Sequence, residues 1–212
     1  MTKLVIIGAG GHARSCIGVI ESSGLFSIQG FVDPKLPVGQ TMVGYPVLGD
    51  NDVIAELNKQ GDVHFFIAIG QIQSADIRVR LFELLTELDA KIIPAIVAKS
   101  AFVSPHATIG EGSIIMQQAV VNTNAQIGKN AIINNLSLIE HDCVVGDHAH
   151  ISTGAIVNGD CRLGDRVFVG SNAVLLQGVT ITSGVVIGAG TTVVNSITSP
   201  GVYAGTPAKK IK

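Results

Sequence analysis

Aromatic side chains are almost missing from this 212-residue sequence, which has no tryptophan, 2 tyrosines and 7 phenylalanines. Its core must therefore be built from small and aliphatic side chains, and 47% of the residues are apolar. Charge is scarce as well, at 14% of the residues, with a net charge of −2. Because a surface that binds nucleic acid needs an excess of lysine and arginine, we expect no nucleic-acid partner.

Cysteine and long hydrophobic runs are also lacking. The 3 cysteines, Cys16, Cys143 and Cys161, show no metal-ligand spacing, and we interpret them as reduced thiols. The apolar run at residues 4–7 is too short for the core of a signal peptide or for a membrane span. We therefore expect a cytoplasmic protein of one or two domains with no membrane partner.

The feature that dominates the sequence is a repeat of six residues. Every sixth residue over positions 103–193 is aliphatic, in phase and without insertion: Val103, Ile109, Ile115, Val121, Ile127, Ile133, Ile139, Val145, Ile151, Val157, Leu163, Val169, Leu175, Ile181, Ile187 and Val193. The residue two places earlier is small or short. Glycine often follows the aliphatic residue, as at Gly110, Gly128, Gly146, Gly164, Gly170 and Gly188. Neither an amphipathic helix nor an alternating strand has this period, which is typical of a hexapeptide β-helix.

The period also predicts how each hexad folds. One short strand and one corner form, and the aliphatic residue points inward to stack on its equivalent in the next coil, roughly 4.8 Å away. We interpret the following glycine as supplying the backbone angles of a tight turn. Outward positions are apolar too, at Ile114, Val120, Ile132, Leu138, Val144, Phe168, Val174 and Val186. Such a surface normally needs a partner, so we expect a homo-oligomer.

The first 97 residues follow a different pattern. Apolar strands are predicted at residues 4–7, 27–32 and 63–69, with a weaker one at 42–48 that contains Gly44 and Pro46. Helices are predicted over residues 13–24, shortly after residue 51, and over residues 74–88. This alternation predicts a small Rossmann-like parallel α/β sheet. We divide the chain into an α/β domain at 1–97 and a β-helix domain at 98–212.

A glycine-rich turn joins the first predicted strand to the first helix. Its pattern, Gly8-x-Gly10-x-x-Ala13, can bring backbone N–H groups to a phosphate at the start of a helix. Asp33, at the end of the next strand, could accept hydrogen bonds from a ribose or a base. The domain has room for only half of a dinucleotide-binding fold, so we expect one nucleotide moiety. The alternative is a turn whose glycines serve packing alone.

The second candidate site lies inside the repeat. Ile139 points inward, so His141 and Asp142 are expected at the adjoining corner and facing outward. A histidine beside a carboxylate suits a general base, because the acid stabilises the charged ring; the alternative is an ordinary surface histidine. His150 follows one and a half hexads later, so the two histidines could line one groove. A metal site is not favoured, because no third strong ligand has a defined place.

These motifs resemble a known family. The segment IEHDCVVGDHAHISTGAIVNGD, the opening GAGGHA and the tail GTPAKKI are similar to those of the sialic-acid O-acetyltransferase and nucleotide-4-amino-sugar N-acetyltransferase family. The resemblance covers essentially the whole chain. It implies a left-handed β-helix with three hexads per coil, about five coils, a homotrimer, and acetyl-CoA bound between neighbouring prisms.

The resemblance also implies roles for individual residues. His141 matches the general base, and Asp142 takes a place where amino-sugar members often have glutamate. The positions expected to contact acetyl-CoA are His150 at the acetyl group, Gly159 with its N–H at the thioester, and Ser171 in the groove. We also expect Lys209 or Lys210 near the phosphates, because a flexible ammonium group suits a phosphate. The positions expected to contact the nucleotide sugar are Gly10, Gly11, His12, Asp33, Gly70, Asn134 and Asn135. Pro34 replaces a second acid found in some members, which leaves the nucleotide open.

We therefore expect an acetyl-CoA-dependent N-acetyltransferase that uses no metal. Its acceptor would be the amino group of a nucleotide-linked 4-amino-deoxysugar in bacterial surface-glycan biosynthesis. O-acetylation of sialic acid is the alternative within the family, because the SLIEH and NGD segments also resemble that branch. An alternative of another class is a non-catalytic scaffold that binds nucleotide, has no groove for CoA and does not need His141.

Overall fold

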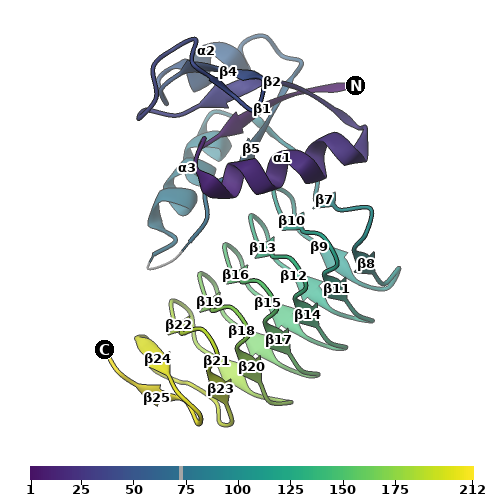
Figure 1. Ribbon diagram of the computed structural model, residues 1–212, viewed down its shortest axis with the longest axis vertical. Helices are drawn as coiled ribbons and strands as arrows, with labels where there is room; N and C mark the ends of the chain where they lie inside the picture. Colours follow the sequence, from purple (N-terminus) through teal and green to yellow (C-terminus); the bar gives the residue numbers. More distant parts are fainter. Residues whose placement is uncertain (72–73) are drawn as a thin grey trace.

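The computed structural model describes residues 1–71 and 74–212, and it shows two parts stacked along the long axis of the molecule (Figure 1). The N-terminal part is a sheet with helices on both sides, and the C-terminal part is a prism of short strands. Helix α1 (Gly11–Ser23) lies between the two parts. None of the helices in the described residues is long and apolar enough to cross a membrane.

The N-terminal part is built on six strands in the order β3-β4-β2-β1-β5-β6. The strands are β1 (Thr2–Ile7), β2 (Phe26–Val32), β3 (Thr41–Met42), β4 (Tyr45–Gly49), β5 (Val63–Ile67) and β6 (Lys91–Ile92). The other helices are α2 (Val53–Asn58) and α3 (Asp76–Glu87). Neighbouring strands are parallel except β3 and β4, which form a hairpin where the sequence predicted one weak strand. The predicted parallel α/β sheet is confirmed.

Alternate residues of β1 pack on opposite sides of this sheet. Leu4 and Ile6 belong to the core shared with α1, whereas Val5 and Ile7 belong to the core shared with α2 and α3. A parallel strand buried on both faces needs such a continuous apolar run. Because β1, β2 and β5 run parallel, their carboxyl ends meet at one edge of the sheet. A ligand site is expected at this edge in this class of fold.

The C-terminal part winds through three flat faces, each a parallel sheet. Face 1 contains β7 (Ile96–Val97), β10 (Ile114–Ile115), β13 (Ile132–Ile133), β16 (His150–Ile151), β19 (Phe168–Val169) and β22 (Val186–Ile187), and the tail adds β24 (Val202–Ala204) and the antiparallel β25 (Lys209–Lys210). Face 2 contains β8 (Phe102–Val103), β11 (Val120–Val121), β14 (Leu138–Ile139), β17 (Ile156–Val157), β20 (Val174–Leu175) and β23 (Thr192–Val193). Face 3 contains β9 (Thr108–Ile109), β12 (Gln126–Ile127), β15 (Val144–Val145), β18 (Arg162–Leu163) and β21 (Thr180–Ile181).

The register of the faces confirms three hexads per coil. Ile115 pairs with Ile133, and Ile133 pairs with Ile151, so each strand lies beside the one eighteen residues later. The aliphatic residues of the repeat form one continuous core with the short residues between them, Cys143 and Cys161 included. The hexapeptide β-helix predicted from the period is therefore the observed fold.

The corners differ from the sequence interpretation in the role of glycine. Every sixth residue from Gly112 to Gly190 has a positive φ, but the glycines that follow the aliphatic residues are not among these positions. Those glycines are needed for the close approach of successive coils. A Cβ at Gly128, for example, would lie only 2.7 Å from the backbone nitrogen of Asp147 in the next coil. The role in turn angles that we assigned to them from the sequence is therefore wrong.

The outer surfaces of the three faces have different surroundings. Ile114 and Ile132, which the sequence assigned to a partner interface, are buried beneath the N-terminal domain of the same chain, with exposures of 0% and 3%. That assignment is wrong because the repeat carries no information on how the first domain packs. Face 2 presents a partly exposed apolar column: Phe102, Val120, Leu138, Ile156 and Val174. The outward residues of face 3 are mostly polar: Thr108, Gln126, Arg162 and Thr180.

Candidate active site

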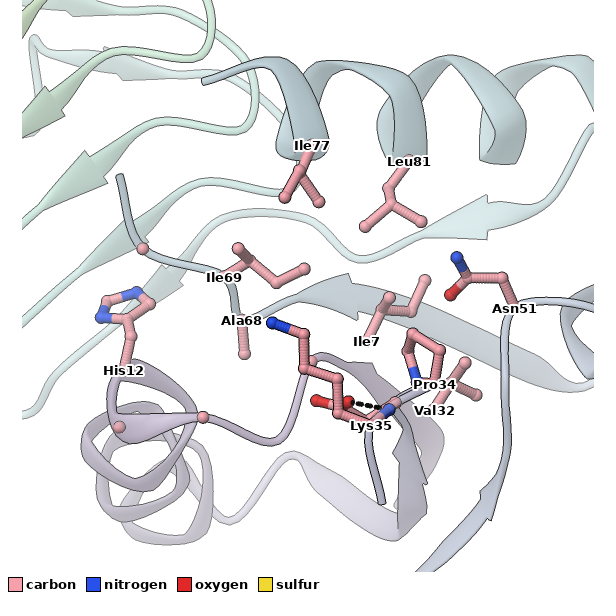
Figure 2. A pocket seen from close by; sticks show the side chains of 15 residues that line it. Ile7, His12, Val32, Pro34, Lys35, Asn51, Ala68, Ile69, Ile77 and Leu81 are labelled. Atoms are coloured by element: carbon pink, nitrogen blue, oxygen red, sulfur yellow. Dashed lines mark hydrogen bonds between the residues drawn. The ribbon is translucent and has the colours of Figure 1, made fainter. Parts of the chain in front are cut away.

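A pocket of about 300 Å³ opens at the carboxyl edge of the N-terminal sheet. The glycine-rich turn after β1, the loop after β2, the segment after β5 and helix α3 bound it (Figure 2). The residues predicted to contact the nucleotide in this domain all line it: Gly10, Gly11, His12, Asp33 and Gly70. Its walls are largely apolar, with Ile7, Val32, Ile69 and Leu81, and such walls suit the face of a nucleoside base.

Two polar residues of this pocket, Lys35 and Asn51, were not predicted from the sequence. Figure 2 shows His12 and Asn51 at opposite ends of the pocket, with the Lys35 ammonium between them. Lys35 follows β2 and Asn51 follows β4, and the carboxyl ends of both strands lie at the edge that forms the pocket. Their position just after parallel strands is the signal that could have identified them.

The Asp33 side chain connects two loops that line the pocket through hydrogen bonds. Its Oδ2 accepts a hydrogen bond from the Ala9 N–H at 2.8 Å, and its Oδ1 accepts one from the Lys35 N–H at 2.9 Å. The carboxylate therefore ties the glycine-rich turn to the loop after β2. Helix α1 begins next to this turn at Gly11, so the positive end of its dipole borders the pocket and favours an anionic group there.

The His12 end of the pocket reaches face 1 of the prism. The ring centroid of His12 lies 6.0 Å from that of His150 on β16. His150 is buried, its Nδ1 lies 3.3 Å from the Gln71 backbone nitrogen, and its Nε2 lies 3.3 Å from Nδ2 of Asn134. The structure therefore brings together His12 and Asn134, which the sequence assigned to the nucleotide sugar, and His150, which it assigned to acetyl-CoA.

Burial and a nearby cation keep these two imidazoles neutral. Burial, and then the positive charge of Arg78, lowers the pKa of His12 to about 4 and that of His150 to about 3. Arg78 lies buried on α3 and donates a hydrogen bond to the carbonyl of Asn130 in the prism. Near pH 7 both rings can therefore contact a ligand through hydrogen bonds without adding charge.

Asn135 and Ser171 lie along the edge between faces 1 and 2. Asn135 follows Asn134 directly, and its N–H donates to the side-chain oxygen of Asn134 at 2.8 Å. The Ser171 hydroxyl lies 3.0 Å from that of Ser152, two coils below Asn135. These positions place both residues on the side of His150, and their contacts with ligands stay predictions.

The predicted His141–Asp142 pair forms at the edge between faces 2 and 3, just after β14. Nδ1 of His141 lies 2.8 Å from Oδ2 of Asp142. This contact is the main cause that raises the pKa of His141 and lowers the pKa of Asp142. The side chains are 49% and 46% exposed, so both are available to a ligand. Among the described residues, no group of three His, Cys, Asp or Glu side chains could hold a metal ion.

Gly159 lies against the His141 ring from the next coil. A Cβ at this position would be 2.6 Å from Cε1 and 2.7 Å from Nε2 of the ring. In the described part of the chain, the Gly159 N–H donates no backbone hydrogen bond, so it remains available to an oxygen of a ligand. The missing side chain thus lets the ring rest on the backbone, and the contact of the Gly159 N–H with a thioester stays a prediction.

We expect Gly159→Ala to inactivate the protein without unfolding it. The added methyl group would displace the half-exposed His141 ring, and a shift of about 1 Å in a catalytic group can cost about 100-fold in rate. Enzyme assays and thermal melts would measure kcat and Tm. Gly146→Ala is the contrasting control, because its methyl group would lie 2.6 Å from the rigid backbone nitrogen of Asp165 and should lower Tm. A Gly159→Ala protein with normal kcat would contradict this role.

The structure does not bring His141 and His150 into one groove of a single chain. His150 faces outward from face 1, whereas His141 lies at the edge between faces 2 and 3. In a triangular cross-section this edge is opposite face 1. The expectation that the two histidines line one groove is therefore wrong for one chain.

The two lysines of the tail differ in their contacts. Lys210 Nζ donates to the Pro200 carbonyl at 2.7 Å, which commits this ammonium to the tail itself. Lys209 lines a pocket of about 280 Å³ between the tail and the last coil, together with Tyr203. Lys209 is therefore the better placed of the two for a phosphate.

Comparisons with known proteins agree with this geometry. The chain matches the PglD N-terminal domain family over residues 3–85 and the GMPPB C-terminal domain family over residues 97–202. The acetyltransferase domain of PglB from Neisseria gonorrhoeae is 31% identical with a TM-score of 0.92, and the match covers 100% of both chains. A comparison with curated protein sequences found no significant match.

Two further solved structures are similar over nearly the full length. PerB from Caulobacter crescentus, in complex with CoA and GDP-perosamine, is 31% identical with a TM-score of 0.91, over 99% of this chain and 97% of that chain. WeeI from Acinetobacter baumannii is 26% identical with a TM-score of 0.86, over 99% of this chain and 100% of that chain.

Fold and site together define an acyltransferase of the hexapeptide-repeat class that carries an added N-terminal α/β domain. The chain belongs to the sialic-acid O-acetyltransferase and nucleotide-4-amino-sugar N-acetyltransferase family, and it is an acyl-CoA-dependent sugar acetyltransferase. The family and the enzyme class predicted from the sequence are confirmed. The alternative of a non-catalytic scaffold is excluded.

Proposed function

We propose that this protein transfers the acetyl group of acetyl-CoA to the 4-amino group of a nucleotide-linked 4-amino-deoxysugar. The observation that carries this proposal is the pocket of the N-terminal domain, which runs from Asn51 to His12 and ends at the prism. A nucleoside fits the apolar walls, its diphosphate fits the start of α1 beside Lys35, and the sugar then reaches the His12 end. PerB, solved with CoA and GDP-perosamine, supports an acceptor of this class.

The proposed chemistry uses the His141–Asp142 pair as a proton carrier. The amine nitrogen attacks the thioester carbonyl carbon, so that a C–N bond forms and the C–S bond breaks. Nε2 of His141 accepts the proton that the nitrogen loses and delivers it to the departing CoA thiolate. Asp142 stabilises the ring while it is charged. The Gly159 N–H donates to the carbonyl oxygen as negative charge develops there.

We further propose that two chains of a homotrimer share each active site. The acceptor pocket opens toward face 1, and the base lies on the opposite edge, so one chain cannot bring its own base to its own acceptor. The apolar column of face 2 offers a surface for the neighbouring chain. Packing of face 2 around a threefold axis would turn the His141 edge of one chain toward face 1 of the next. Acetyl-CoA would lie in that groove, along His150, Ser171 and Lys209.

In this arrangement the two domains have different roles. Residues 1–97 would hold the nucleotide sugar, and residues 98–212 would supply the groove for acetyl-CoA and the base. The three cysteines are free and buried, which fits a reducing compartment such as the cytoplasm.

A panel of acceptors tests the proposed reaction. We expect acetyl-CoA-dependent thiol release and an acetyl mass increase with nucleotide-linked 4-amino sugars. The matched control is the same nucleotide sugar with a hydroxyl group at the 4-position, which should not react. Turnover of sialic acid alone, or equal turnover of the 4-hydroxy control, would overturn the proposal in favour of O-acetylation.

A further inference from the structure

A third side chain holds the His141–Asp142 pair from the coil above. Asn124 lies eighteen residues before Asp142, and its Nδ2 donates a hydrogen bond to Oδ1 of Asp142 at 3.1 Å. The other carboxylate oxygen, Oδ2, contacts the His141 ring at 2.8 Å. Each oxygen of the carboxylate is therefore assigned to a different partner, and rotation of the carboxylate would break both contacts.

The backbone on both sides fixes the same arrangement. The Asp142 N–H donates to the Thr123 carbonyl at 3.0 Å, and the Asp160 N–H donates to the His141 carbonyl at 3.0 Å. Asn124, Asp142 and Asp160 each have a φ near 60°, a left-handed conformation that asparagine and aspartate adopt more readily than most residues. Three successive coils thus present equivalent corners in register, and the side chains of two of them are joined by a hydrogen bond.

We propose that Asn124 is a positioning residue, which orients the Asp142 carboxylate so that His141 keeps the tautomer and ring position needed for proton transfer. This inference rests on the proposed function, in which Nε2 of His141 accepts the proton. The Asp142 carboxylate, held by Asn124, accepts a hydrogen bond from Nδ1–H of His141. Nε2 then carries no proton and is free to accept one. Asn124 itself contacts neither the reacting atoms nor the His141 ring in this mechanism.

The charges around the pair determine how a substitution should act. Besides Asp142, the groups that raise the pKa of His141 are Asp160 from the coil below and Glu140 from the same corner. His106 and Arg162 line the open groove beside Asp142, on the side of face 3. Asn124 carries no charge, and its hydrogen bond stabilises the charged form of Asp142.

Two substitutions of Asn124 should shift the pKa of His141 in opposite directions. Asn124→Gly keeps the left-handed backbone but removes the donor, so Asp142 turns toward water and the pKa of His141 falls toward its ordinary value. Asn124→Asp keeps the size of the side chain but also loses the donor, and its negative charge raises the pKa of His141 whether or not the Asp142 carboxylate stays in place. We expect kcat to fall about 10-fold for Asn124→Gly with KM for acetyl-CoA nearly unchanged.

Histidine-selective NMR titration of the full-length protein without substrates measures this pKa directly, with His141→Ala to assign the signal. Val43→Gly is the control, because Val43 is exposed and also has a positive φ, of 49°, but lies between β3 and β4 in the N-terminal domain. It should leave the pKa and kcat unchanged. An unchanged His141 pKa in Asn124→Gly would overturn the inference, even if Asn124→Asp raises that pKa and even if the protein proves to be the proposed enzyme. Shifts in opposite directions would support it even if the acceptor proves to be different.

Discussion

His141→Ala should lower kcat by about 100- to 10,000-fold, which is the usual contribution of a positioned general base. The hydrogen bond to Asp142 raises the pKa of His141, so in the wild-type protein the ring loses its proton only above the ordinary value of about 6.5. A base must be neutral to accept a proton. The rate should therefore fall on the acid side, with a midpoint above pH 6.5, and the variant should lose this dependence.

Two comparisons separate this loss from other causes. The His141 side chain is 49% exposed and outside the stacked core, so Tm of the variant should stay close to that of the wild type. Asp142→Asn should cost less in kcat and should move the acid limb to lower pH. An amine acceptor becomes neutral by itself at alkaline pH and should partly rescue the variant, whereas a hydroxyl acceptor should not. Full activity of a folded His141→Ala protein across this pH range would remove the residue from the mechanism.

The prism could be predicted in detail from the sequence because its repeat is local. Each hexad specifies one strand and one corner, so the period alone identifies the inward residues, such as Ile133 and Ile151. The period alone did not predict the role of Gly128 and Gly146. Their requirement comes from the approach of the next coil, eighteen residues later, and it becomes visible only once three hexads are known to form a coil.

The candidate site was predictable in its parts but not in its arrangement. Loop residues after strands and the His141–Asp142 pair follow from local patterns. The burial of Ile114 and Ile132 depends on how the first domain packs over face 1, and no local pattern encodes that packing. The same packing places His150 beside His12, whereas the three hexads of each coil put the edge that carries His141 opposite face 1. Lys35 and Asn51 belong to no motif, and only their position just after predicted strands could have identified them.

Mixing two inactive variants should restore activity if each active site is built from two chains. One variant is His141→Ala, which keeps its acceptor pocket. The other is Gly10→Leu, which should fold but block the pocket. A Cβ at Gly10 meets no atom within 4 Å, and Gly10 has an ordinary φ of −82°, so the added side chain causes no backbone strain. Each variant alone should be nearly inactive, and Gly10→Leu should raise KM for the acceptor while leaving acetyl-CoA binding intact.

Co-expression with two different affinity tags would give mixed trimers for assay. Random mixing of equal amounts places an intact His141 edge against an intact pocket at about a quarter of the interfaces, so about a quarter of the wild-type activity should return. The control is a mixture of wild type with a chain that carries both substitutions. Sites shared between chains predict about a quarter of the activity there too, whereas sites within one chain predict about a half. No recovery in the first mixture, together with half activity in the control, would show that each chain acts alone and would overturn the shared site.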